Sequence, residues 1–111
     1  MRRRVERVND IIEEQVSVII PDIVELKGVL VTVQEVRTSI DLHHAQVIVS
    51  ALPEKYLPQI MKRLEKRVGY IQKILNGRLR MRPVPKLRFV ADTGSIKEKQ
   101  VLDAIRSTEE D

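Results

Sequence analysis

Residues 57–79 read LPQIMKRLEKRVGYIQKILNGRL, and this stretch decides the fold that the sequence predicts. Its apolar residues recur every three or four positions, as on the buried face of an α-helix. They are Leu57, Ile60, Leu64 and Val68, followed by Ile71, Ile74 and Leu75. Gly69 falls between the two runs, and a glycine inside a helix costs about 1 kcal/mol relative to alanine. We therefore expect a kink at Gly69, between a helix that ends near Arg67 and a helix from about Tyr70 to Leu79.

Two strands are predicted before this helical stretch and one after it. Leu30–Val36 is rich in β-branched residues. Its valines stand at odd positions before Gln34–Glu35 and at an even position after it, which indicates a β-bulge there. In Ala45–Ala51 apolar and polar positions alternate, so we expect a half-buried strand that forms an antiparallel hairpin with the first. Leu87–Ala91 alternates in the same way after two prolines and predicts a third strand.

The two ends of the chain complete the predicted domain. A helical apolar stripe predicts a first helix from about Arg3 to Ile19, ended by Pro21. Apolar residues within Val101–Ile105 allow one more short helix, and residues 107–111 are expected to be frayed. The sequence thus predicts a single α+β domain over residues 1–106, with three helices on one face of a three-stranded sheet.

Composition narrows the classes of function. A chain of 111 residues with 42% apolar and 32% charged residues is typical of one globular domain. It has no cysteine, which excludes disulfides, thiol chemistry and cysteine-ligated zinc. No uninterrupted apolar run exceeds three residues, so we expect neither a membrane span nor a signal peptide, and a cytoplasmic protein.

Positive charge is concentrated in one segment. Lys62–Arg88 holds ten Lys/Arg residues and one acid, Glu65, although the whole chain carries only +4. A solvated helix face usually alternates acids with bases at i,i+4 spacing, and this segment hardly does. Arginines also crowd the start of the first helix at positions 2–4 and 7, where each opposes the helix dipole by roughly 0.3–1 kcal/mol. Both features favour a surface that binds the phosphates of a nucleic acid.

Catalytic and metal sites are poorly supported. His43 and His44 are adjacent on a strand or turn and would point apart, so they cannot easily ligate one metal ion. Ser39, Asp41 and His43 could be written as a catalytic group, but no pocket or oxyanion hole is indicated beside them. The three aromatic residues leave no base-stacking face on the predicted sheet, so we expect contacts to RNA backbone and shape with little base readout.

Several segments in the same order resemble one protein family. These are Asp41–Ala45, Tyr70–Leu75, Arg78–Arg82, Val84–Phe89 and the Asp92…Ser95 pair, together with the arginine-rich start. Together they resemble the ribosome-binding factor A family over nearly the whole chain. The resemblance implies a KH-like domain of the second type, with a helix-kink-helix at a small-x-Gly sequence in place of a Gly-x-x-Gly loop. This chain has Arg67 where that family usually has the small residue, and Lys86 where it often has an acid.

The resemblance also implies a function. Members of this family are non-enzymatic assembly factors that bind the small ribosomal subunit and its rRNA late in maturation. The residues expected to contact RNA are Arg3, Arg4, Arg7, Arg63, Lys66, Arg67, Gly69, Lys73, Arg78, Arg80 and Arg82. The cations would neutralise phosphates, and Gly69 would admit the RNA backbone close to the helix. No cofactor, metal, small-molecule substrate or membrane is implied, and we expect a monomer.

Two other functions remain open at this level. Lys62–Arg67 and Tyr70–Leu79 could form the helix pair of a helix-turn-helix DNA-binding protein, although the one or two residues between them are fewer than such a turn usually has. The basic segment could instead bind an acidic protein partner. Competition among structured rRNA, duplex DNA and a polyanion would separate these functions.

Overall fold

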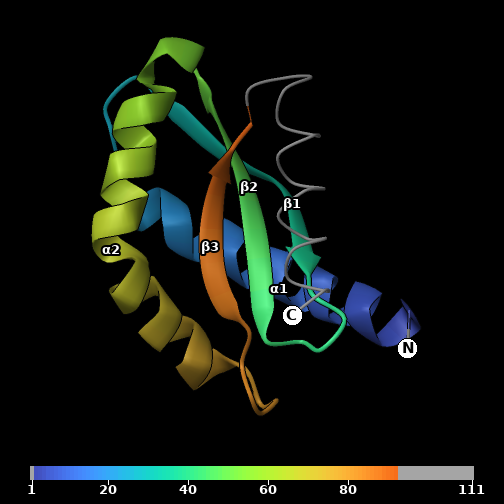
Figure 1. Cartoon of the computed structure of the whole chain (residues 1–111). Coiled ribbons are helices and arrows are strands. Elements are labelled where there is room, and N and C mark those ends of the chain that lie inside the picture. The colour runs from blue at the N-terminus through green and yellow to red at the C-terminus, as the bar shows by residue number, and fades with distance from the viewer. Residues whose placement is uncertain (1, 93–111) are drawn as a thin grey trace.

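The computed structural model describes residues 2–92 and shows helices packed against a small sheet (Figure 1). The elements are α1 (Arg2–Ile23), β1 (Leu30–Thr38), β2 (His44–Leu52), a short 3-10 helix (Glu54–Tyr56), α2 (Leu57–Arg78) and β3 (Lys86–Ala91). The expected short helix in Val101–Ile105 and the frayed residues 107–111 lie outside the described residues.

The three strands form one sheet in the order β1-β2-β3. β1 and β2 are antiparallel, with Val33 opposite Val49 and Val36 opposite Val47, and the register shifts between Val33 and Glu35. The predicted hairpin and the predicted bulge are therefore confirmed. β3 runs parallel to β2, because α2 carries the chain back to the end of the sheet where β2 begins.

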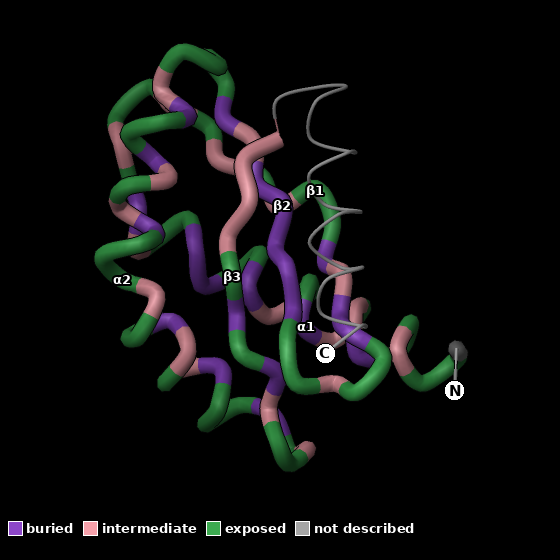
Figure 2. The backbone as a smooth tube through the Cα atoms, viewed as in Figure 1, coloured by how far each residue is buried: buried purple, intermediate pink, exposed green. Residues whose placement is uncertain are grey.

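A single core lies between the helices and one face of the sheet. Strand residues of one parity are buried there, among them Val47, Val49 and Leu87, together with Ile12 and Val16 of α1 and residues of α2. α1 contacts β1, α2 contacts β3, and the two helices contact each other. Figure 2 shows the buried segments gathered where these elements meet, with exposed backbone on the outer side of α2.

The prediction of two separate helices on either side of Gly69 is wrong. α2 is one α-helix of 22 residues, so residues 2–92 contain two α-helices where three were expected. Leu64 and Ile71 lie on either side of the glycine and are both fully buried, so the core holds the two halves in one helix. Burial of such side chains is worth about 1.5–3 kcal/mol each and outweighs the cost of a helical glycine.

α1 is also longer than predicted, since Pro21 lies inside it and the helix ends at Ile23. Ile20 and Val24 are fully buried, and the Val24 amide donates to the Ile20 carbonyl at 3.0 Å. A proline removes one backbone donor but does not prevent a final turn that the core stabilises. None of the helices in residues 2–92 is long and apolar enough to span a membrane.

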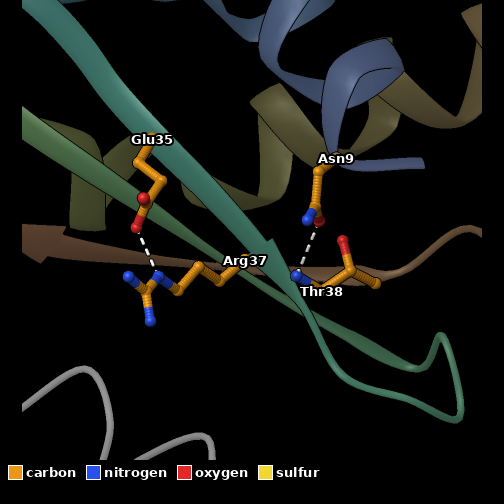
Figure 3. Close-up of polar contacts among 4 residues, drawn as sticks. All are labelled: Asn9, Glu35, Arg37 and Thr38. Atoms are coloured by element: carbon orange, nitrogen blue, oxygen red, sulfur yellow. Dashed lines mark hydrogen bonds and ion pairs between the residues drawn. The ribbon is translucent and has the colours of Figure 1, made fainter. Parts of the chain in front are cut away.

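Two side-chain amides join helices to strands. The Thr38 amide donates to Asn9 Oδ1 at 2.8 Å, which fixes α1 against the end of β1 (Figure 3). Gln72 on α2 donates from Nε2 to the Pro85 carbonyl at 3.0 Å and accepts from the Leu87 amide at 2.8 Å. The Gln72 carboxamide thus pairs with the start of β3 as a neighbouring strand would. The two Gln72 contacts set where the segment between α2 and β3 lies.

Candidate nucleic-acid interface

Exposed lysines line the outer side of α2. Lys62, Lys66 and Lys73, here called the lysine stripe, follow spacings of four and seven residues and lie opposite the buried face of the helix. At 1.5 Å per residue, Lys62 and Lys73 are separated by roughly 16 Å along the axis. Neither they nor any other cation in Lys62–Arg88 forms an ion pair with an acid in residues 2–91. The ion pair within those residues joins Arg37 to Glu35 on β1 (Figure 3).

Gly69 lies within the lysine stripe and is exposed. A methyl group built at this position would meet no atom within 4 Å outside its own helical turn. Packing inside the chain therefore does not require a glycine here, although a helical glycine costs about 1 kcal/mol. The missing side chain leaves room for close approach by a partner.

Three of the predicted arginines lie on the flank of α2 that faces α1. Arg63 donates to the Glu25 carbonyl at 2.6 Å, and Arg78 donates to Gln15 Oε1 at 3.2 Å. Arg67 lies on the same flank by helical geometry and is exposed, and its side chain makes no hydrogen bond to another described residue. Arg78 thus links α2 to α1, and Arg63 links α2 to the segment that follows α1. Their remaining N–H groups and charge are available at the surface.

The segment between α2 and β3 adds two exposed arginines. Arg82 donates to the carbonyls of Leu79 and Met81, at 3.2 and 2.7 Å. Arg80 is exposed and makes no hydrogen bond to the rest of residues 2–92. Pro85 is buried at the end of the segment, where Gln72 holds its carbonyl, so these arginines sit on backbone fixed at both ends.

The start of α1 meets this segment at one position. Arg4 and Arg82 both line a cavity of about 210 Å³, together with Asp41 and apolar residues from three parts of the chain. Arg4 therefore lies beside the basic segment. Arg3 and Arg7 are exposed on α1 but do not line this cavity.

The basic segment does not form one continuous face. Leu87 is buried in the core, so its neighbours Lys86 and Arg88 point to the opposite face of the sheet, and both are exposed. The lysine stripe points away from the sheet on the far side of α2. The charge that is contiguous in sequence is therefore divided between surfaces, and the larger share lies on α2 and the segment that follows it.

The candidate catalytic group forms a turn. The Ser39 hydroxyl donates to Asp41 Oδ1 at 2.6 Å and accepts from the His44 amide at 3.1 Å, while the His43 amide donates to the same carboxylate oxygen at 3.0 Å. The hydrogen bond from Ser39, and then that from His43, lowers the pKa of Asp41 from its ordinary value of 3.8. The serine hydroxyl donates to the carboxylate and meets His44 only through its backbone amide, so the turn lacks the serine–imidazole hydrogen bond of a catalytic triad.

No group of three or more possible metal ligands occurs within the described part of the chain. His43 and His44 are both exposed, in the turn and at the start of β2. The polar residues of this hairpin support its backbone. That backbone includes Leu42, whose φ of 63° lies in the left-handed region.

Comparison with known proteins places the chain in a family. Residues 4–105 match the family model described as "Ribosome-binding factor A". The chain is 32% identical to ribosome-binding factor A of Prochlorococcus marinus, over 96% of this chain and 90% of that protein. It is 39% identical to ribosome-binding factor A of Alkalilimnicola ehrlichii, over 81% of this chain and 72% of that protein.

Solved structures agree with this assignment. The crystal structure of ribosome-binding factor A from Thermus thermophilus matches with a TM-score of 0.67 and 25% identity, over 78% of this chain and 94% of that one. A Thermus thermophilus homology model fitted into a cryo-EM map of a complex of that factor with the 30S subunit matches with a TM-score of 0.57 and 27% identity, over 76% and 94%. This chain belongs to the ribosome-binding factor A family.

Proposed function

We propose that this chain is a non-enzymatic, cytoplasmic assembly factor that binds the small ribosomal subunit and its rRNA during late maturation. The observation that carries the proposal is the absence of acid partners, within residues 2–91, for the cations of Lys62–Arg88. Unpaired cations on a folded surface attract phosphates and release the counterions of RNA on binding. The relative from Thermus thermophilus, described in a complex with the 30S subunit, supports this choice of partner.

The proposed contact surface comprises the outer side of α2 and the segment after it. The side chains of Lys66, Lys73 and Arg80 make no hydrogen bond to the rest of the described chain and are the first candidates for phosphate contacts. Arg63, Arg78 and Arg82 would contribute charge from positions that their bonds to Glu25, Gln15, Leu79 and Met81 hold in place. Arg4 would join them beside Arg82, with Arg3 and Arg7 farther along α1.

A helix-turn-helix mechanism receives no support from this geometry. Such a motif needs two helices joined by a turn, and the two proposed helices are one continuous α2. Binding to an acidic protein remains the alternative that an experiment must separate from RNA binding, because both depend on the same charges.

The decisive experiment compares two double variants with the same change in net charge. Lys66→Ala/Lys73→Ala removes two cations from the lysine stripe, and Lys27→Ala/Lys55→Ala removes two exposed lysines from outside it. Binding to isolated small subunits is measured over a salt series. Each lost phosphate contact should reduce the slope of log K against log salt by roughly 0.7, so the first variant should lose about 1.4 and the second almost nothing.

The control measurements test whether the variants stay folded and whether the partner is RNA or an acidic protein. Both variants should keep their melting temperatures, because exposed charges contribute little to stability. Free small-subunit rRNA should compete with the subunit, whereas an acidic polypeptide of the same charge should compete poorly. If the two variants bound alike, the lysine stripe would have no part in binding; if the polypeptide competed as well as rRNA, the acidic-protein alternative would be favoured.

A further inference from the structure

Tyr70 is the aromatic residue that the structure leaves most open to solvent. The chain has three aromatic side chains, and Tyr56 and Phe89 are half-buried, whereas 55% of Tyr70 is exposed. Tyr70 lies on the outer side of α2, four residues after Lys66 and three before Lys73. Its hydroxyl makes no hydrogen bond to another described residue. Neither packing nor a polar contact within residues 2–92 thus accounts for a large flat ring at this position.

The space around the ring is open. Long side chains in a helix generally lean toward its N-terminus, and Lys66 precedes Tyr70 by about one turn while Gly77 follows it by about two. A methyl group built at Gly77 would meet no atom within 4 Å outside its own turn. The cation that lies over an aromatic ring within residues 2–92 is Lys55, 5.2 Å from the centre of the Tyr56 ring. No lysine or arginine of the described chain covers Tyr70 in this way.

We propose that Tyr70 stacks against one unpaired base of single-stranded RNA, while Lys66 and Lys73 bind the phosphates on either side of that nucleotide. The proposal rests on the proposed function and specifies the RNA that this surface takes. The two lysines are separated by roughly 10 Å along the helix axis, with the tyrosine between them. Every base has a π-face, so the contact would be tolerant of sequence. This agrees with a surface that reads RNA shape more than base identity.

The first test uses the fluorescence of Tyr70. The chain has no tryptophan and two tyrosines, so in a Tyr56→Phe variant of the full chain Tyr70 is the only source of tyrosine emission. This variant is titrated with a short single-stranded oligoadenylate and with an abasic oligomer of the same length, which keeps the phosphates. We expect the oligoadenylate to quench Tyr70 emission and the abasic oligomer to leave it unchanged. No quenching, or equal quenching by both oligomers, would overturn the proposal.

The second test measures affinity for isolated small subunits. Tyr70→Leu keeps apolar bulk but removes the ring, and Tyr70→Phe keeps the ring and removes the hydroxyl. Loss of one stacked base should weaken binding by roughly 5- to 150-fold in the leucine variant, and the phenylalanine variant should bind as the parent chain does. The melting temperature of each variant shows that folding is retained. Equal binding by the leucine variant would contradict the stacking contact.

The two tests separate this proposal from the proposed function. If the parent chain binds small subunits but Tyr70→Leu binds equally well, the stacking proposal fails and the proposed function stands. If the parent chain fails to bind small subunits while oligoadenylate still quenches Tyr70, the proposed function fails and the stacking site stands.

Discussion

Replacement of Gly69 by alanine should raise the stability of this protein and lower its affinity for the small subunit. The residue is helical, since the core holds Leu64 and Ile71 on either side of it in the same helix. A methyl group at this position would meet no atom within 4 Å, so no clash offsets the gain in helix propensity. The free energy of unfolding should therefore rise by about 1 kcal/mol, which corresponds to a melting temperature roughly 4–8 °C higher for a domain near this size.

The effect on binding should have the opposite sign. If RNA backbone approaches the helix at Gly69, a methyl group there intrudes into a close contact and costs about 1–3 kcal/mol, as excess volume does in a packed interior. This corresponds to a loss of roughly 5- to 150-fold in affinity. Stability is measured by denaturant unfolding, and affinity by co-sedimentation with isolated small subunits at one fixed salt concentration.

Ser17→Ala serves as the matched control. Ser17 is exposed on α1, and alanine is the better helix former by a few tenths of a kcal/mol, so this variant should also be more stable. It adds no atom to the outer side of α2 and should leave the affinity unchanged. Unaltered affinity in Gly69→Ala would refute close approach at this residue, and a loss of stability in that variant would refute the helical account of Gly69.

Two further predictions concern the polar contacts that support the surface. Gln72→Leu leaves the Pro85 carbonyl and the Leu87 amide without the partners that they have at 3.0 and 2.8 Å, so the free energy of unfolding should fall by roughly 1–3 kcal/mol. Gln72→Glu keeps an acceptor for the Leu87 amide but turns a carboxylate oxygen toward the Pro85 carbonyl, so it should lose stability as well; unchanged urea unfolding of both variants would contradict this role for the amide. The folded pKa of Asp41 is lowered, so its contribution to stability should be complete above its ordinary pKa of 3.8 and be lost as the pH falls through the folded value. An NMR titration of the Asp41 carboxyl group checks this direction, and a midpoint above 3.8 would contradict it.

Local sequence patterns predicted the three strands, but β2 is not half-buried as expected, because Gln46 and Ile48 on its other face are buried as well. The alternation in β2 and the change of parity in β1 depend on which side chains face the core, and side chains of a strand alternate with a period of two residues. The hairpin and the bulge near Gln34 were predicted from that period, whereas the residue pairing between the two strands comes from the structure. The parallel pairing of β3 with β2 did not follow, because it depends on where α2 returns the chain.

Two separate helices around Gly69 were predicted wrongly for a physical reason. Helix propensity is a local quantity of about 1 kcal/mol for glycine, whereas the burial of Leu64 and Ile71 depends on α1 and on the sheet. Tertiary packing can exceed local propensity, and only the folded structure shows that it does so here. The extension of α1 past Pro21 has the same origin, since Ile20 and Val24 are buried on either side of the proline.

The strongly basic segment with almost no acids is apparent from residue identity, because charge and its distribution along the chain follow directly from the order of the residues. Which of these cations share a surface depends on how the chain folds. The 3.6-residue period of α2 turns Lys66 and Lys73 outward and Arg63 and Arg78 toward α1, and the two-residue period of β3 sends Lys86 and Arg88 to the other face of the sheet. Neighbours in sequence are separated in space because side-chain direction follows secondary structure, and the packing of each element against the core fixes the face on which a charge meets solvent.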